Sequence, residues 1–456
     1  MRPETAPIRL KRGDGTGGPH PLTCFLSHKT LSTTCETSGK SAMKRLILFA
    51  AFLISACTGT DRLAPRQDRT AYVGAMVWDG EAFRPRDIVV EGDHIVDAPA
   101  RSANHRVELG GSYVIPPFCE AHNHNLGMPD ENEASIARYL REGIFYVGIL
   151  SNLPAITDPI RHTYNTPTSV DVIFANGPLT ASGGHPIRLR ESLLERGVYP
   201  GFTRETLPGQ GYFVIDDEAD LQRHWPTIAS QRPDFIKIIL VSSEEFAGRR
   251  DDPAFFGEKG LDPALVPRIV ERAHANDLRV FAHVNTAHDF HVAVAAGVDV
   301  VAHLPGTKYP TSIDPADAQS AARRGVVVIT TTMLIERPNV AERRPALREA
   351  QIANLRLLRD AGVTLAAGSD EYDETSSAEI TYLRTLGVFS DAELLRMWTT
   401  NCARTLFPDR RVGGLDPGNE ASFLALGADP LANFDAVRNI RLRVKQGAAL
   451  EAGILR

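Results

Sequence analysis

The 456-residue sequence has few cysteines, few aromatic residues and no apolar segment long enough to cross a membrane. It contains five cysteines and three tryptophans, and aromatic residues make up 7% of the chain. Five cysteines in a chain of this length do not form the dense framework of a disulfide scaffold. The apolar run at residues 46–54 is shorter than the ~20 residues that a membrane-spanning helix needs.

An excess of positive charge is also missing from most of the chain. The formal net charge is -6, but residues 1–56 hold eight basic and three acidic residues, so the remainder carries -11. An acidic body of this kind binds a phosphate backbone poorly, which excludes nucleic acid as a partner. The whole sequence contains 43% hydrophobic and 23% charged residues. This composition and the length are typical of a globular protein with two or three domains.

Residues 43–57 have the organisation of a secretory signal. A basic start at residues 43–45 is followed by the apolar run 46–54 and by small residues before Cys57. The ending resembles a bacterial lipoprotein signal, in which the cysteine is acylated and becomes the new N-terminus. A plain cleaved signal with an incidental cysteine is the alternative.

This resemblance implies a signal peptide at residues 43–56, a lipid on Cys57 and a tether at residues 57–69. Thr58 follows the cysteine, as in lipoproteins sorted to the outer membrane. We therefore expect an exported periplasmic protein that contacts the membrane only through its lipid anchor. Residues 1–42 resemble neither a signal nor a domain and are interpreted as a non-native upstream extension.

The body of the chain contains two cysteines, Cys119 and Cys402. We expect both to be buried free thiols. An oxidising periplasm would permit a bridge between them, which is the alternative.

A repeated strand-and-helix rhythm begins at residue 114. Short apolar runs alternate with helical patterns such as 263–276 and 346–360, which predicts parallel strands joined by helices. The eight runs are 114–122, 145–150, 171–175, 235–240, 279–283, 300–303, 326–331 and 364–370. Their total span is close to the ~250 residues of a (β/α)₈ barrel. We predict an α/β fold with a TIM barrel over residues 114–406.

The segments on either side of this barrel are rich in β-forming residues. Residues 70–98 alternate short β-rich runs with turns, which predicts a small antiparallel unit. The tail contains similar runs at 422–426 and 439–446. We therefore expect residues 70–113 and 407–456 to form one composite β-sandwich.

Six polar residues end or interrupt the apolar runs, although they lie far apart in the sequence. They are His122, His124, Lys237, His283, His303 and Asp370. The active site of a barrel gathers at the carboxyl ends of its strands, and residues i and i+2 of a strand share a face. Imidazoles and a carboxylate that converge there suit divalent metal ions. Each residue alone could have a structural role, but six such coincidences argue against it.

Lys237 lies inside the apolar run 235–240. A buried ammonium is costly unless its pKa falls or it gains a partner. One interpretation is an aliphatic stem that carries the charge to the barrel mouth. The other is a neutral amine that takes up CO₂ and forms a carbamate, an anion able to bridge two metal ions.

Five motifs together resemble the amidohydrolase superfamily of metal-dependent hydrolases. They are residues 114–124, Lys237, residues 282–284, residues 301–306 and residues 367–370. The resemblance covers roughly residues 70–450. It is nearest to the branch with a carboxylated lysine on strand four, which includes prolidase-like dipeptidases and relatives of imidazolonepropionase.

The resemblance implies a binuclear metal site built from the six residues above. One divalent ion, expected to be zinc, would bind His122, His124 and Asp370. A second would bind His283 and His303, and carboxylated Lys237 would bridge the two. A hydroxide shared by the ions would attack a carbonyl carbon, and Asp370 would transfer its proton to the leaving amine.

Two positions depart from the patterns of the superfamily. Glu120 stands where Asp or Gly is more common, and we expect it to have a supporting or structural role. Thr286 stands where the deaminases carry a glutamate, three residues after the histidine of strand five, which disfavours deamination.

Substrate recognition is predicted less sharply. The loop at residues 177–213 contains Gly183-Gly184-His185, and prolidase-like relatives have a similar stretch, so His185 is expected near the substrate. An exposed turn is the alternative. No cluster of arginines in the sequence indicates a carboxylated or phosphorylated substrate.

We expect hydrolysis of an amide or cyclic-amide bond, dipeptides included, in a small-molecule substrate. The alternatives are a hydrolase of esters, lactones or phosphoesters and a non-catalytic lipid-anchored surface protein. The sequence leaves the oligomeric state open, a homo-oligomer included.

Overall fold

The computed structural model describes residues 68–455. The chain divides into Met1–Leu63 and Ala64–Arg456, and only the second unit contains described residues. The expected upstream extension, the signal peptide at residues 43–56 and the lipidation site at Cys57 lie outside them. Within residues 68–455, no helix combines the length and the apolar character needed to span a membrane.

Ten strands form two parallel sheets in the central part of the chain. The first sheet has the order β6 (Phe118–Asn123), β7 (Ile144–Ile149), β8 (Asp171–Phe174). The second has the order β10 (Phe213–Val214), β9 (Leu179–Thr180), β11 (Ile236–Ile239), β12 (Val280–His283), β13 (Val300–Val301), β14 (Val327–Ile329), β15 (Leu365–Ala366). Each of the eight predicted apolar runs contributes one of these strands.

Backbone hydrogen bonds connect the edges of the two parallel sheets. Ala121 N on β6 donates to Ala367 O next to β15, and Asp234 N before β11 donates to Phe174 O at the end of β8, both at 2.9 Å. Among the described residues these contacts are too few to form a ladder. The predicted closed barrel is therefore seen as a mixed α/β arrangement of two parallel sheets.

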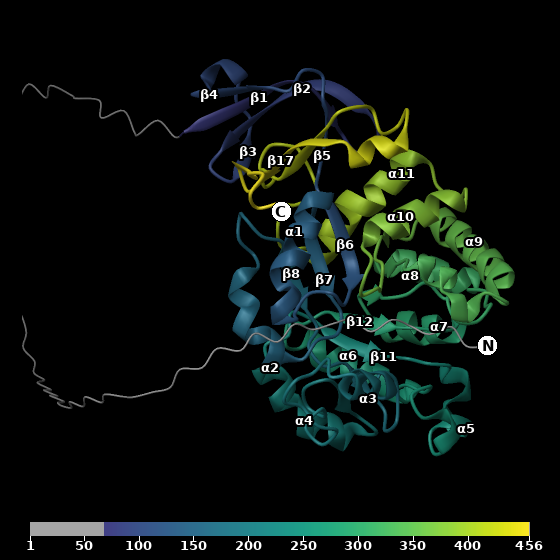
Figure 1. The fold of residues 1–456 in the computed structure, drawn as a ribbon. Helices are drawn as coiled ribbons and strands as arrows, with labels where there is room; N and C mark the ends of the chain where they lie inside the picture. The colour runs from purple at the N-terminus through teal and green to yellow at the C-terminus, as the bar shows by residue number, and fades with distance from the viewer. Residues whose placement is uncertain (1–67, 456) are drawn as a thin grey trace, which may run out of the picture. The chain divides into compact units, whose positions relative to one another are not determined.

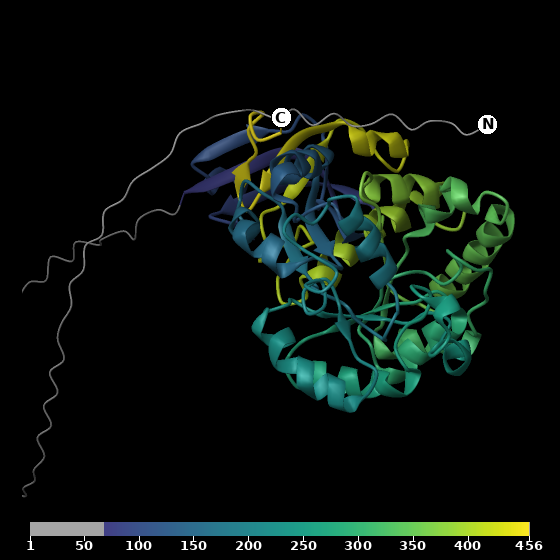
Figure 2. The same ribbon diagram turned by 60° about the horizontal axis from the view of Figure 1, so that its bottom comes forward.

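Helices follow most of these strands, and in both views they surround them (Figures 1 and 2). The longer ones are α1 (Asn132–Glu142), α3 (Ile187–Glu195), α4 (Glu218–Ser230), α6 (Val266–His274), α7 (Ala287–Ala296), α8 (Pro315–Arg324), α9 (Arg344–Asp360) and α10 (Ser376–Thr385). Shorter helices are α2 (Pro154–Thr157), α5 (Phe246–Arg249), α11 (Asp391–Arg396) and α12 (Cys402–Leu406).

Helix α7 illustrates how the sequence sets the helix ends. Thr286 caps its first turn in a reciprocal pair with Asp289, and Gly297 ends it at φ 84°. A left-handed residue at a helix end is favourable for glycine, which has no Cβ. The sequence Ala296-Gly297 therefore marks the end of this helix.

Both ends of the described chain contribute to a separate eight-stranded sheet, drawn in purple and yellow in Figure 1. Its N-terminal strands are β1 (Arg69–Trp78), β2 (Phe83–Glu91), β3 (His94–Val96), β4 (His105–Glu108) and β5 (Tyr113–Ile115), and its C-terminal strands are β16 (Phe423–Leu426), β17 (Ile440–Lys445) and β18 (Ala448–Ala449). The order is β18-β17-β16-β5-β1-β2-β3, with β4 paired to β1. The antiparallel pairing of β5 with β16 joins the two ends.

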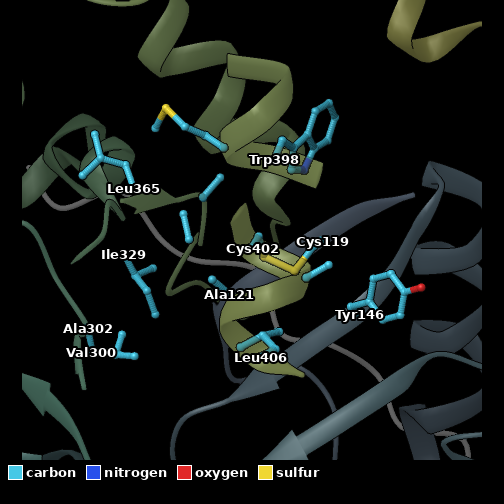
Figure 3. Packing of buried hydrophobic residues seen from close by; sticks show 14 of the residues in the cluster. Cys119, Ala121, Tyr146, Val300, Ala302, Ile329, Leu365, Trp398, Cys402 and Leu406 are labelled. Atoms are coloured by element: carbon cyan, nitrogen blue, oxygen red, sulfur yellow. A yellow bond between two sulfur atoms is a disulfide. The ribbon is translucent and has the colours of Figure 1, made fainter. Parts of the chain in front are cut away.

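Cys119 and Cys402 form a disulfide, so the prediction of two free thiols is wrong. Cys119 lies on β6 and Cys402 opens α12, and the packing of these elements brings their Cα atoms to 5.7 Å (Figure 3). This separation suits a disulfide. The sequence separation of 283 residues hides the contact. Trp398 and Leu406 belong to the same buried apolar cluster.

Candidate active site

A cavity of about 370 Å³ lies at the carboxyl ends of the parallel strands, and we call it the site cavity. Its lining includes all seven residues that the sequence analysis selected: His122, His124, His185, Lys237, His283, His303 and Asp370. They come from β6, β11 and β12 and from the segments after β6, β9, β13 and β15. The carboxyl ends of parallel strands meet at one edge, which explains why residues so distant in sequence converge.

Asp370 lies at the centre of one group of side chains. Its Oδ1 is 2.9 Å from His124 Nε2 and 3.2 Å from His122 Nε2. Its Oδ2 is 3.6 Å from His303 Nδ1. His122, His303 and Asp370 each offer a ligand atom, and these atoms lie within 4.8 Å of one another. This separation and donor set fit a divalent cation.

Two further imidazoles extend this group across the site cavity. The ring centroids of His283 and His303 lie 4.4 Å apart, and those of His283 and His185 lie 4.9 Å apart. His122 and His303 are separated by 4.6 Å. The imidazoles therefore form a continuous row.

Desolvation and charge set the ionisation of this cluster. Burial lowers the pKa of His122, His283 and His303 well below the usual value, so these imidazoles are neutral at pH 7. Neutral imidazole is the form that binds metals. Burial opposes the ionisation of Asp370, but His122 and His303 outweigh it and hold the pKa of this carboxyl well below its usual range.

Lys237 is the buried amine of the site. Its side chain on β11 is 4% exposed, and its Nζ has no hydrogen-bond partner in the described structure. Desolvation lowers the pKa of Lys237 to about 7, against the attraction of Asp370. A large share of neutral amine is therefore present near neutral pH, and neutral amines react with CO₂. The orphaned Nζ fits the carbamate interpretation better than an exposed charge.

Sequence comparisons find similarity to a known family of enzymes. Residues 253–448 match the family model described as the Amidohydrolase family. An imidazolonepropionase of Haloarcula marismortui is 26% identical over 270 residues, which cover 51% of this chain and 63% of the relative, less than two thirds of its length. An imidazolonepropionase of Pseudomonas aeruginosa is 24% identical over 385 residues, which cover 77% of this chain and 86% of the relative.

Solved structures share the fold. The ochratoxinase of A. niger has a TM-score of 0.66 at 20% identity, over 84% of this chain and 95% of that one. A prolidase complexed with N-methylphosphonate-L-proline has a TM-score of 0.66 at 19% identity, over 84% and 99% of the two chains. The family match and the two relatives together support an amidohydrolase superfamily hydrolase.

Glu120 supports the site through hydrogen bonds to the segments that carry His122 and Asp370. It is fully buried and accepts hydrogen bonds from Ser369 N at 2.8 Å, Ser369 Oγ at 3.0 Å and His122 N at 3.2 Å. Burial raises the pKa of Glu120 to about 8, against these hydrogen bonds. By linking residues 122 and 369, it fixes β6 against the turn that carries Asp370.

Further contacts orient the imidazoles. Ala302 O lies 2.9 Å from His122 Nδ1, which can donate to it and leave Nε2 directed at Asp370. Such an outer hydrogen bond fixes a histidine tautomer. Gly368 allows β6 and the segment after β15 to approach closely, because a Cβ at residue 368 would lie 2.7 Å from His122 N.

Thr286 occupies the position at which the deaminases carry a glutamate, and it has a structural role in this chain. Thr286 caps α7, and its Oγ1 donates to Glu244 Oε2 at 3.0 Å. It is not among the residues that line the site cavity.

Sequence reasoning missed several polar residues that line the site cavity. They include Ser151, Arg190, Lys308, Arg337, Arg343 and Tyr372. They lie in connecting segments or on α3, where no periodic pattern marks them. The absence of a clustered arginine motif was therefore a poor guide, because the arginines converge only in the folded chain.

Proposed function

We propose that this enzyme hydrolyses an amide or cyclic-amide carbon–nitrogen bond of a small molecule with the help of two divalent metal ions. The observation that carries the proposal is the convergence of four imidazoles, Asp370 and an unpartnered buried lysine at one cavity. Similarity to the Amidohydrolase family supports it, as do similar proteins named as imidazolonepropionase and prolidase.

The proposed metal ligands are those that the resemblance implies, in which His303 binds the second ion although its ligand atom also lies within 4.8 Å of those of His122 and Asp370. His122, His124 and Asp370 would hold one ion, and His283 and His303 would hold the other. Lys237, carboxylated by CO₂, would bridge them. We take zinc as the candidate because the donors are a mixture of imidazole and carboxylate.

When bound, the ions would supply an activated water and polarise the substrate carbonyl. The remaining chemistry is assigned to residues of the chain. Asp370 would hold the proton from the attacking water and transfer it to the leaving amine, because it is the carboxylate that lines the site cavity. His185, which lines the site cavity beside His283, would contact the substrate.

We also propose a complete fold and a location in the cell for this protein. We interpret the two parallel sheets as one TIM barrel over residues 114–406, with the flanking sheet as a composite β-sandwich of residues 70–113 and 407–456. Export to the bacterial periplasm and a lipid on Cys57 are retained as proposals. The Cys119–Cys402 disulfide supports an oxidising compartment, and Cys57→Ser should release the protein from the membrane fraction.

Metal analysis of the purified protein, followed by a hydrolysis screen, tests the proposed function. We expect about two ions per chain and turnover of N-acyl amino acids or dipeptides in preference to lactones. His283→Ala should lower the metal content, whereas His288→Ala, an exposed histidine on α7, is the matched control and should not. Metal well below one ion per chain together with full activity would refute the proposal.

The carbamate has its own test. Lys237→Ala should lose metal and activity, and short-chain carboxylic acids should restore part of both by occupying the place of the carbamate. Full activity of Lys237→Ala without any added acid would remove Lys237 from the site.

A further inference from the structure

Arg190 on α3 is a buried guanidinium at the wall of the site cavity. Its side chain is 6% exposed. It also lines an adjacent cavity of about 690 Å³, which we call the side cavity. The residues shared by the two cavities are His124, Ser151, Arg190 and Tyr372. Arg190 therefore lies where a ligand in the site cavity would extend into the side cavity.

No carboxylate of the described residues 68–455 forms an ion pair with Arg190. Its terminal nitrogens donate to two neutral hydroxyls, those of Tyr199 and Ser151. Its Nε has no partner. Of the five N–H donors of a guanidinium, two are used. Each terminal nitrogen keeps one free N–H, and such a pair matches the two oxygens of a carboxylate.

Arg410 shows how another partly buried guanidinium of this chain is compensated by carboxylates. Although it is less buried, it pairs with Asp171 at 2.7 Å and with Glu420. A desolvated charge is costly unless a partner compensates it. Two hydroxyls and the ring of Tyr199, whose centroid lies 5.5 Å from the guanidinium carbon, do not supply the missing negative charge of Arg190. A structural role alone therefore leaves its burial unexplained.

The charge of the whole lining points the same way. Apart from the amine Lys237, four residues that line the site cavity are basic: Arg190, Lys308, Arg337 and Arg343. Asp370 is the one acidic residue of this lining. Arg337 is paired with Glu371 at 2.8 Å, but Arg343 donates to a backbone oxygen, Lys308 O, at 2.9 Å. A cleft lined by one sign of charge concentrates ligands of the opposite sign.

We propose that the substrate carries a free carboxylate next to its scissile bond, and that Arg190 binds this carboxylate. The inference rests on the proposed function and narrows it to anionic amides. Leu189 and Tyr372, which are 39% and 42% exposed, also line the site cavity. They offer apolar surface to the neighbouring part of the substrate.

The test compares two probes on the same enzyme preparations. One is a series of N-acetyl amino acids, and the other is the same series with the carboxylate replaced by a primary carboxamide. Acetate release gives kcat/KM for each. We expect wild-type enzyme to prefer the acids, and Arg190→Met to reduce the ratio of acid to amide by about 30-fold or more, the loss expected for a charged hydrogen-bonded pair. The fraction of folded enzyme cancels in this ratio.

Arg188→Met is the matched control, because Arg188 is an exposed arginine on the same helix and does not line the site cavity. It should leave the ratio unchanged. Arg190→Lys should fall between wild type and Arg190→Met, since it keeps the charge and loses the paired donors. An unchanged ratio in Arg190→Met, or an equal decline with both probes, would overturn the inference and leave the proposed function standing. A wild-type enzyme that releases acetate from neither series would remove both.

Discussion

Two buried lysines, Lys237 and Lys445, are treated in opposite ways by this fold. Both side chains are nearly inaccessible, with exposed fractions of 4% and 0%. Lys445 Nζ donates to Asp171 Oδ1 at 2.7 Å and to Thr166 O at 2.8 Å. Lys237 Nζ has no partner in the described structure. Lys445 lies between the flanking sheet and the parallel strands, and Lys237 lies in the site cavity.

The difference separates a structural charge from a reactive amine. Desolvation lowers the pKa of both lysines, but the carboxylate of Asp171 opposes the shift of Lys445, and Arg410 and Glu420 complete the same network. Desolvation lowers the pKa of Lys237 to about 7, because the attraction of Asp370 compensates only in part. A buried amine without a partner costs stability, and the cost is acceptable where its reactivity serves function.

The largest expected effect comes from Lys237→Met. Turnover should fall on the order of 10³-fold or more, because the proposed bridge between the ions is removed and metal catalysis supplies several kcal/mol. The free energy of unfolding of the metal-free protein should stay the same or rise, since no pair is broken and no amine is desolvated. Steady-state kinetics and urea denaturation measure the two effects. Wild-type turnover together with a less stable fold would reverse the roles of the two lysines.

Lys445→Met should show the opposite pattern. It leaves the Asp171 carboxylate buried with Arg410 as its remaining partner, so we expect the free energy of unfolding to fall by about 3 kcal/mol. The turnover of the folded fraction should be close to wild type, because Lys445 does not line the site cavity. The double variant Lys445→Met/Asp171→Asn should recover part of the stability. No recovery in the double variant would mean that the pair itself is not the origin of the loss.

The disulfide offers a covalent comparison with this polar network. Cys119→Ala/Cys402→Ala should lower the free energy of unfolding by about 2–4 kcal/mol, because the bond closes a loop of 283 residues in the unfolded chain. Adding a reductant to wild-type protein under unfolding conditions should reproduce the loss, and the same reductant should not affect the double variant. Equal stability of both proteins without reductant would argue that the bridge does not form.

The sequence predicted the strands and the site well because each rests on a local pattern. Every predicted apolar run coincides with a parallel strand, and His122, Lys237 and Asp370 could be selected because they interrupt or end such runs. A buried parallel strand is apolar along most of its length, so it can be recognised as an apolar run in the sequence. Because the carboxyl ends of neighbouring parallel strands meet at one edge of the sheet, these residues come together there and no long-range contact has to be predicted.

Features that depend on packing between distant elements were not predictable in this way. The Cys119–Cys402 bridge joins a strand to a helix far along the chain, and no local pattern reports that contact. Arg190 lies on a short helix after a long loop, among residues that look like an ordinary charged surface. Its missing carboxylate can be recognised only after every neighbour is known, which explains why the sequence showed no cluster of arginines.

The pH dependence of stability gives the smallest expected effect and isolates Lys445. Its pKa is lower in the folded protein than the ordinary value of 10.5, chiefly through desolvation. In the window just below pH 10.5, the unfolded chain therefore binds more protons than the folded one, and the free energy of unfolding should rise with pH. Each unit of pKa difference is worth about 1.4 kcal/mol. The contribution is the difference in slope between wild type and Lys445→Met, measured by urea denaturation at several pH values, because the other titrating groups cancel in it. A steeper rise in Lys445→Met than in wild type would show that pairing with Asp171, and not desolvation, dominates the energetics of this lysine.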